Sequence, residues 1–359
     1  MNENREVITK SSSPRGRGAL SNPPNRFETL RLERDEDWNP EEEPSPKTQF
    51  LRDLSQTIIT YNDSPDIPFK ASINSFRGCE HGCSYCYARP THEYLGFSAG
   101  LDFERKIMVK ENAPELLRKE LSSPKWKPQE LAMSGVTDCY QPIERKLQIT
   151  RRCLAVLAEF RNPVSIITKN ALVTRDLDLL KELTAHRAVH VNISITTLDS
   201  ELAHKLEPRA ASPRQRLEAM ATLAKAGVPA GVLVAPVIPA INDHEIPSVL
   251  AAAKAAGASW AYTEVLRLPL TVAPIFQEWL ERNFPDRKDK VLGRIRAIRG
   301  GKLNDPRFGS RMRGEGIFAD QISRMFHVAR RKVGLPEEGP ELSTVAFRRP
   351  GGPQLALNL

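Results

Sequence analysis

The 359-residue sequence has no long apolar run. No stretch approaches the ~18 consecutive apolar residues that a membrane-spanning helix needs. The first twenty residues also lack the apolar core of a secretory signal, so we predict no signal peptide, no membrane partner and a cytoplasmic location. Hydrophobic residues make up 40% of the chain, which suffices for a sizeable core in one large catalytic domain with extensions or in two ordinary domains.

Cysteine is scarce and unevenly placed. The chain has five cysteines, and Cys79, Cys83 and Cys86 fall within eight residues, apart from Cys139 and Cys153. An odd number without a secretion signal argues against a disulfide framework. In a reducing compartment, such a tight group indicates a metal site.

The first fifty residues contain few apolar side chains. Ser11–Pro14 and Pro23-Pro24 precede an acidic run from residue 35 to residue 43. So little apolar surface cannot offset the entropy of ordering the chain, so we predict a disordered tail over residues 1–50. Contact with nucleic acid through the Arg15–Gly18 stretch is the less favoured alternative to a flexible tail.

The positive charge lies in the last fifth of the chain. From Asp286 onward there are 16 Lys and Arg against 8 Asp and Glu, whereas the preceding residues balance at 36 of each. The excess indicates either a patch that attracts the phosphates of a nucleic acid or a solvated basic surface, and both readings stay open. We expect helices near residues 287–298 and 318–332, a short strand at 344–347, and a basic C-terminal extension over 271–359 that packs on the core.

Between residues 70 and 267 short apolar runs alternate with segments of helical spacing. Parallel strands covered by helices explain runs that are too apolar for a sheet with one wet face. The six predicted strands begin at Ala71, Leu131, Val164, Val189, Ala230 and Trp260.

One of these strands distinguishes an open sheet from a barrel. In the run from Val189, apolar residues alternate with His190, Asn192, Ser194 and Thr196, so one face of the strand is polar. A polar face suits the lumen of a barrel that receives a ligand. We therefore predict an α/β fold whose core, over residues 60–270, is a partial (β/α)6 TIM-like barrel of parallel strands, with a helical C-terminal extension.

The cysteine loop, residues 78–89, directly follows the first predicted strand, where β/α barrels place their chemistry. Its spacing is C-x3-C-x2-C, and three thiolates can hold three irons of a four-iron cluster while the fourth iron keeps an open position. Gly78 and Gly82 allow the backbone to wrap a bulky cluster. The alternatives are a zinc site completed by Cys139 or His81, a thiol redox pair, and cysteines that only fill the core.

These residues resemble the radical S-adenosylmethionine (SAM) superfamily. The resemblance rests on C-x3-C-x2-C with an aromatic residue before the last cysteine. The sequence of the cysteine loop, together with Thr137–Pro142 and Thr168-Lys169, resembles that of the branch related to spore photoproduct lyase. The resemblance covers roughly residues 60–270.

The resemblance implies a [4Fe–4S] cluster on Cys79, Cys83 and Cys86 and SAM bound at its open iron. Reductive cleavage then gives a 5′-deoxyadenosyl radical that abstracts a substrate hydrogen. It implies a lyase or transferase type of enzyme that needs a reductant such as flavodoxin or ferredoxin. The residues that it places near SAM are Tyr85, Tyr87, Ser134, Gly135, Lys169, Ser194, Thr196 and Arg209.

Two of these positions depart from the family pattern or have a competing explanation. Ser134-Gly135 is followed by Val136-Thr137-Asp138 where the family often has Gly-Gly-Glu. Arg209 either meets a carboxylate of the ligand or pairs with Glu207.

Cys139 is a candidate hydrogen-atom donor by analogy with spore photoproduct lyase. A buried free cysteine is the favoured alternative.

For the substrate, three readings stay open. The first is a nucleic acid or a nucleotide-like molecule, the second is a peptide or small metabolite, and the third is a zinc-binding adaptor without catalysis.

Overall fold

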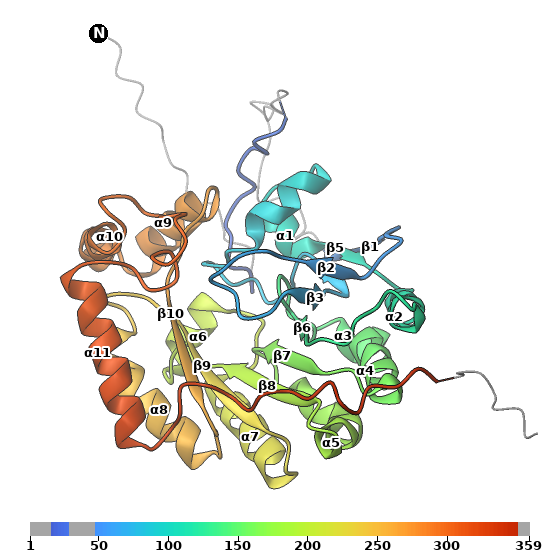
Figure 1. Ribbon diagram of the computed structural model, residues 1–359. Coiled ribbons are helices and arrows are strands. Elements are labelled where there is room, and N and C mark those ends of the chain that lie inside the picture. The colour runs from blue at the N-terminus through green and yellow to red at the C-terminus, as the bar shows by residue number, and fades with distance from the viewer. Residues whose placement is uncertain (1–15, 29–46, 351–359) are drawn as a thin grey trace, which may run out of the picture.

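The central element is a seven-stranded sheet in the order β10-β9-β8-β7-β6-β3-β2 (Figure 1). The computed structural model describes residues 16–28 and 47–350. Every neighbouring pair from β3 to β10 is parallel, and only β2 (Ile59–Tyr61) joins antiparallel at the edge. The six parallel strands are β3 (Ala71–Ile73), β6 (Leu131–Met133), β7 (Val164–Thr168), β8 (Val189–Ser194), β9 (Ala230–Val237) and β10 (Ala261–Val265).

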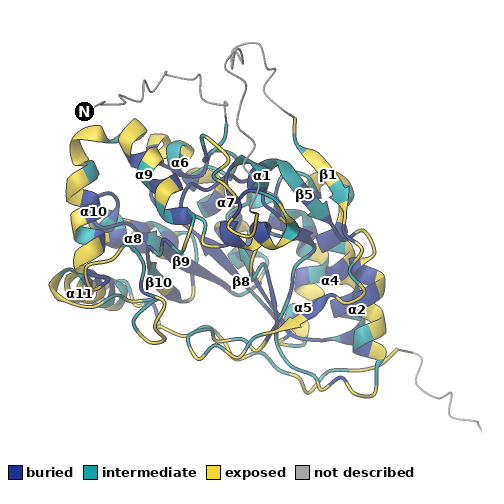
Figure 2. Cartoon of the chain, turned by 90° about the horizontal axis from the view of Figure 1, so that it is seen from above, coloured by how far each residue is buried: buried dark blue, intermediate teal, exposed yellow. Residues whose placement is uncertain are grey.

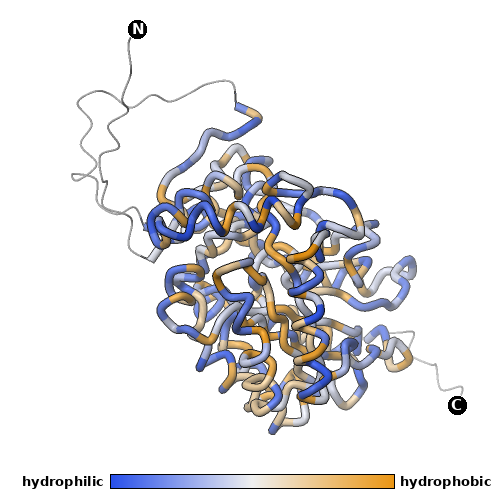
Figure 3. The backbone as a smooth tube through the Cα atoms, turned by 90° about the vertical axis from the view of Figure 1, so that its left-hand side faces the viewer, coloured by the Kyte–Doolittle hydropathy of each residue, from blue (hydrophilic) through white to orange (hydrophobic). Residues whose placement is uncertain are grey.

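Helices between the strands cover the outside of this sheet, so the predicted partial (β/α)6 barrel is confirmed. Apolar side chains gather at the centre of the fold, whereas the outward faces of the helices are exposed (Figures 2 and 3). All six predicted strands are present within a few residues of their expected bounds. The covering helices are α2 (Ala113–Ser122), α4 (Ile149–Phe160), α5 (Leu177–Ala185), α7 (Pro213–Lys225) and α8 (Ile246–Ala255), and the short α3 (Glu144–Leu147) and α6 (Ser200–Leu206) lie in loops after strands.

Strand β8 has the two faces that its sequence predicted. Val189, Val191 and Ile193 belong to the main hydrophobic core. On the other face, Asn192 accepts a hydrogen bond from Nε1 of Trp260 at 2.9 Å, and Ser194 is fully buried. Because the core side is filled by apolar residues, these polar groups face the lumen of the partial barrel.

The cysteine loop leaves the barrel through a second, smaller sheet. Strand β4 (Phe76–Arg77) follows β3 and pairs with β5 (Lys106–Val109), which in turn pairs with β1 (Gln49–Arg52). The 3-10 helix η1 (Arg89–Leu95) and the short helix α1 (Leu101–Arg105) complete this layer. The loop is therefore held between the barrel and a separate cap.

The C-terminal region packs on the barrel as helices and a strap. Helices α9 (Val272–Asn283), α10 (Lys288–Ala297) and α11 (Ile317–Lys332) include both predicted helices, whereas α9 was not expected. The predicted strand at 344–347 is wrong: these residues form a turn closed by Phe347 N–H on the Thr344 carbonyl. No second strand pairs with them because the segment lies across strand ends rather than along an edge.

The strap, residues 334–350, crosses the N-terminal ends of the barrel strands (Figure 1). Its backbone hydrogen-bonds to Ala261 at the start of β10, to Arg187 before β8 and to Phe160 before β7. It therefore closes the end of the barrel opposite the cysteine loop.

Part of the expected N-terminal tail is ordered. Residues 1–15 and 29–46 lie outside the described residues. Residues 16–28 differ from the predicted disordered tail, because Gly18 and Ala19 are buried against the cysteine loop. Their N–H groups donate to the buried carboxylate of Glu104. The division into a tail, a core over 60–270 and an extension stays a prediction.

Trp260 fills the closed end of the lumen. It is fully buried and lies between the backbones of Gly231 and Gly339. A Cβ atom at Gly231 would lie 2.1 Å from the Trp260 ring, and one at Gly339 would lie 2.8 Å from it. Both glycines are therefore required by the tryptophan and not by their own backbone conformation.

We expect Gly231→Ala to lower the free energy of unfolding by about 1–3 kcal/mol, because the added methyl group overlaps Trp260. The matched control is Gly293→Ala in α10, where an added Cβ meets nothing within 4 Å. Because alanine favours a helix, the control should gain about 0.5–1 kcal/mol. Chemical denaturation measures both, and a neutral Gly231→Ala would contradict the packing described for Trp260.

Candidate active site

The cysteine loop has no regular secondary structure before Arg89, so short turns close part of its backbone and other segments satisfy the rest. Cys79 N–H donates to the Phe103 carbonyl at 2.9 Å and Ser84 N–H to the Leu206 carbonyl at 3.0 Å. Gly78 and Gly82 adopt φ of +81° and +67°, which a residue with a side chain rarely adopts. The loop is thus fixed by its contacts with several distant elements.

The three thiols of the loop lie close together in a mostly apolar setting. Cys79 and Cys83 are buried, and Cys86 packs against the apolar clusters that contain each of them. Burial raises the pKa of Cys83 well above its ordinary value, with further contributions from Glu207, Cys86 and Cys79 that outweigh the lowering by Lys169. Three unpaired, converging thiols beside one ammonium group suit an iron–sulfur cluster, whose thiolate ligands need a low-polarity cradle.

Asp138 connects the cysteine loop to the ends of β6 and β7. One carboxylate oxygen accepts from Thr168 Oγ1 at 2.8 Å and from Tyr140 N–H at 2.9 Å. The other accepts from Lys169 N–H at 2.7 Å and lies 3.4 Å from His81 Nδ1. Although burial lowers the pKa of His81, Asp138 and Cys79 outweigh it and raise this pKa to about 10.

Gln141 and Glu80 form a second connection to the loop. The Gln141 side chain accepts from Glu80 N–H at 2.9 Å and donates to the Gly78 carbonyl at 3.3 Å. The Glu80 carboxylate accepts from Ile143 N–H at 2.8 Å and pairs with Arg209 at 3.2 Å. The predicted alternative that Arg209 pairs with Glu207 is therefore wrong, because Arg209 pairs with Glu80 instead.

Glu207 instead lies at the centre of a buried group of polar side chains. It pairs with Arg216 and accepts hydrogen bonds from the hydroxyls of Tyr85 and Thr196. Although burial raises the pKa of Glu207, Arg216 and Lys169 lower it to about 2. Tyr85 and Thr196 thus have their hydroxyls engaged within the protein, beside Cys83.

Three polar groups of the lumen and the cysteine loop remain available to a ligand. Ser84 and Ser194 are fully buried, and their hydroxyls have no hydrogen-bond partner among the described residues. The Lys169 ammonium lies 6.0 Å from the centre of the Tyr85 ring and within electrostatic range of Cys83, Cys86 and Glu207. An unsatisfied buried hydroxyl is costly, so Ser194 points to a missing polar partner in the lumen.

The segment after β6 carries the predicted SAM-binding positions Ser134 and Gly135. Ser134 adopts φ of +80°, and its hydroxyl accepts from Cys139 N–H at 2.8 Å. The Gly135 carbonyl accepts from the Tyr87 hydroxyl at 2.8 Å. The guanidinium carbon of Arg267 lies 5.0 Å from the centre of the Tyr87 ring, and Arg267 pairs with Glu264 at 3.5 Å. The structure thus brings Tyr87 and Gly135 into direct contact.

Cys139 lies in the hydrophobic core. It is 2% exposed and is grouped with Tyr140, Ile149 and Cys153. Its position matches the alternative of a buried free cysteine, and the role of hydrogen-atom donor stays a prediction.

The thiols do not form a site for a single metal ion. Within residues 16–28 and 47–350, no three His, Cys, Asp or Glu side chains are grouped as ligands of one ion. A zinc site needs four ligands around one ion, whereas a cubane spreads its thiolates over separate irons. The described residues therefore hold no ligand set of the kind that a single zinc ion requires.

Many arginines of the basic C-terminal region brace the fold. Arg299 donates to the carbonyls of Val265, Leu266, Ser310 and Arg311. Arg311 pairs with Asp66 at 2.6 Å, and Arg349 donates to carbonyls near α2. Much of the local charge excess thus holds the extension in place.

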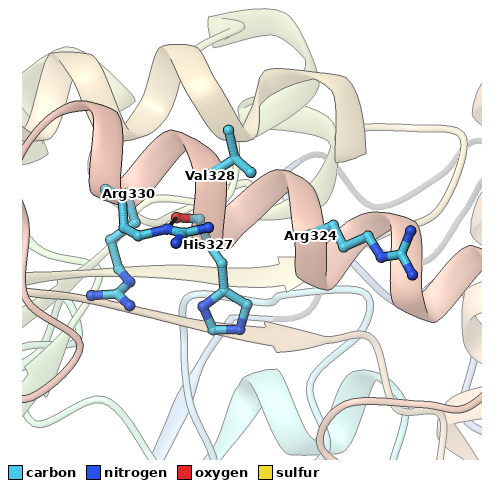
Figure 4. Close-up of a pocket in the computed structure, with 5 residues that line it drawn as sticks. Arg324, His327, Val328 and Arg330 are labelled. Carbon is cyan, nitrogen blue, oxygen red and sulfur yellow. Dashed lines mark hydrogen bonds between the residues drawn. The ribbon is translucent and has the colours of Figure 1, made fainter.

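A remaining basic surface lies on α11. An open, shallow pocket along one face of this helix is lined by Arg324, His327, Val328, Arg330 and Arg331, of which Arg330 pairs with Glu337 at 3.1 Å (Figure 4). Helix α11 packs against α8 on the outside of the barrel, on its flank (Figure 1). This surface is therefore separate from the lumen that the thiols face.

No helix in the described part of the chain is long and apolar enough to cross a membrane.

The fold and the cysteine loop together define the family. The model of the radical SAM superfamily matches residues 73–253, so the chain belongs to this superfamily. Its members use a [4Fe–4S] cluster and SAM. Spore photoproduct lyase complexed with dinucleoside spore photoproduct has a similar fold, with a TM-score of 0.57 and 16% identity over 79% of each chain.

Relatives by sequence include proteins of bacteria, archaea and a phage. An uncharacterized protein of Mycobacterium tuberculosis is 36% identical over 61% of this chain and 65% of its own length. An uncharacterized protein of Methanocaldococcus jannaschii is 31% identical over 60% of this chain and 77% of its own. The radical SAM Nalpha-GlyT isomerase of Pseudomonas phage M6 is 26% identical over 60% of this chain and 43% of its own.

The sequence names Asp138 and Gln141 as parts of the Thr137–Pro142 motif and Arg89 as part of the cysteine loop, but it does not predict that they support the loop. It indicates Glu207 only as a partner of Arg209 and gives no role to Glu104, Arg216 or Glu264. The available signal was a charged residue within an apolar stretch, which requires a buried partner. That signal does not say which partner, because the pairs join segments far apart in the sequence.

We expect Asp138→Asn to weaken retention of iron and sulfide by about 10–100-fold in affinity. Both carboxylate oxygens accept hydrogen bonds, and an amide would turn one N–H₂ toward a donor. Iron and sulfide per chain after anaerobic reconstitution and desalting measure the effect. The control is Asp178→Asn, which changes an exposed carboxylate paired with Arg151. Equal iron content in both variants would exclude this role for Asp138.

Proposed function

We propose that Cys79, Cys83 and Cys86 hold a [4Fe–4S] cluster and that the chain is a radical SAM enzyme that binds SAM beside it. The observation that carries the proposal is the convergence of three unpaired thiols from one loop at the C-terminal ends of the barrel strands. When bound, the cluster and SAM supply the electron and the 5′-deoxyadenosyl radical for hydrogen abstraction.

The chain's own residues would bind and orient SAM. Lys169 offers a cation to the methionyl carboxylate, and Ser194 offers the free hydroxyl of the lumen. Ser134 and Gly135 follow β6, and the Tyr87 hydroxyl fixes the Gly135 carbonyl there. Tyr85 presents its ring near the thiols, whereas Thr196 and Arg209 act through Glu207 and Glu80 and position the loop.

An external reductant completes the requirements of the superfamily. We propose a small electron carrier such as flavodoxin or ferredoxin.

We expect release of 5′-deoxyadenosine when the anaerobically reconstituted protein is reduced in the presence of SAM. Cys83→Ala should abolish it, since one of the three cluster ligands is lost. The matched control is Cys153→Ala, because Cys153 lies within α4 in the hydrophobic core. Chromatography of the nucleoside product measures the result. One zinc per chain without iron or sulfide, and no release under strong reduction, would overturn the proposal.

For the substrate, we propose a nucleic acid or a nucleotide-like molecule. The proposal is supported by the spore photoproduct lyase branch, by the phage relative named for an Nalpha-GlyT substrate, and by the basic pocket on α11. The second candidate is a peptide or a small metabolite. The internal use of Arg299, Arg311 and Arg349 favours it, because those charges are not available to phosphates.

Salt distinguishes the two candidates. If three phosphates are contacted, affinity for a single-stranded oligonucleotide should fall about 20-fold between about 50 and 200 mM salt. Arg324→Ala should weaken binding, whereas Arg214→Ala, an exposed arginine on α7, should not. Fluorescence anisotropy measures both. Binding that ignores salt, or none to DNA or RNA, would favour the peptide or metabolite.

A further inference from the structure

A short N-terminal segment lies directly on the cysteine loop. We call residues 17–19 the N-terminal seal. A Cβ atom built on Gly18 would lie 1.7 Å from the Gly82 carbonyl oxygen and 3.0 Å from Ser84 N. The two backbones are therefore in contact without a side chain between them, at the part of the loop that joins Cys79 to Cys83. Only glycine fits at residue 18.

A buried ion pair holds the seal in this position. The Glu104 carboxylate accepts from Gly18 N–H at 3.1 Å and from Ala19 N–H at 2.8 Å. The same carboxylate pairs with Arg89, which donates to the Cys83 carbonyl at 2.8 and 3.0 Å. Glu104 and Arg89 are fully buried. One pair thus joins the seal to the cysteine loop.

Contacts along the following residues fix the direction of the segment. Leu101 N–H donates to the Ser21 carbonyl at 3.2 Å, and the Ser98 hydroxyl donates to the Pro23 carbonyl at 2.7 Å. The Asn25 amide donates to the carbonyls of Glu93 and Phe97. Residues 21–25 therefore run along η1 and α1, and their contacts anchor the segment that carries the seal.

We propose that the N-terminal seal covers the cysteine loop and keeps solvent-borne reagents from the thiols of Cys79 and Cys83 and from the cluster that the loop would hold. With the seal in place, Cys79 and Cys83 are only 7% and 8% exposed. Arg17 strengthens the closure because it donates to the Glu104 carbonyl at 2.8 Å and to Thr48 Oγ1 at 2.9 Å. The part of the proposal that concerns the cluster rests on the proposed function, and the part that concerns the thiols does not.

The first test uses the metal-free full chain and iodoacetamide. The variants are Gly18→Ala, whose methyl group cannot fit against Gly82, and a chain that lacks residues 1–19. The control is Gly293→Ala, and Cys153, which is fully buried in α4, is the internal reference. Mass spectrometry of the cysteine peptides gives the rate of alkylation at each thiol.

We expect both sealing variants to speed alkylation of Cys79 and Cys83 about tenfold or more, as local opening does, with Cys153 and the control unchanged. Unchanged rates in both variants would overturn the proposal. So would equal acceleration at Cys153, because that result means global opening of the fold and not the removal of a local cover.

The second test uses the reconstituted protein in air. Loss of the visible iron–sulfur absorbance should be faster in both sealing variants than in the wild type and in Gly293→Ala. Equal bleaching would overturn the protection of the cluster. If the chain takes up no iron and sulfide, the proposed function fails, and the alkylation rates still decide whether the seal covers the thiols.

Discussion

The main constraint on this structure is that an irregular, buried loop must satisfy its backbone polar groups with partners from elsewhere. A loop that wraps a cluster cannot be a helix or a strand, so it has no internal ladder of hydrogen bonds. Here the partners are Gln141, Arg89 and backbone groups of residues 103 and 206. Gln141 and residues 103 and 206 come from three separate segments, so the thiols converge only when the barrel, its cap and the loop after β8 are all assembled.

Buried carboxylates link these segments. Asp138, Glu104 and Glu207 each accept several hydrogen bonds and each faces a basic side chain, namely His81, Arg89 and Arg216. Removing one partner of such a pair leaves an uncompensated charge, which is strongly destabilising, by about 3–5 kcal/mol. The same pairs therefore give rigidity to the fold and position to the thiols, while Lys169 and Ser194 are left to meet a ligand.

The basic C-terminal region has a structural part and an exposed part. Arg299 and Arg349 donate to backbone carbonyls, and Arg311 pairs with Asp66 in the segment between β2 and β3. The strap of residues 334–350 closes the N-terminal end of the barrel, and Trp260 fills the lumen beside it. A count of charges along the sequence cannot separate these arginines from those of the α11 pocket, because the difference lies in which partners the fold brings within reach.

The sequence by itself determined the six parallel strands, the polar face of β8 and the C-x3-C-x2-C loop after the first strand, because hydrophobic period and ligand spacing are local properties. The tertiary structure alone decided that Arg209 meets Glu80 and that residues 17–19 lie against the loop. The absence of a strand at 344–347 was decided in the same way. Each of these features depends on two segments far apart in the chain, and no local pattern encodes which of several buried charges will be neighbours.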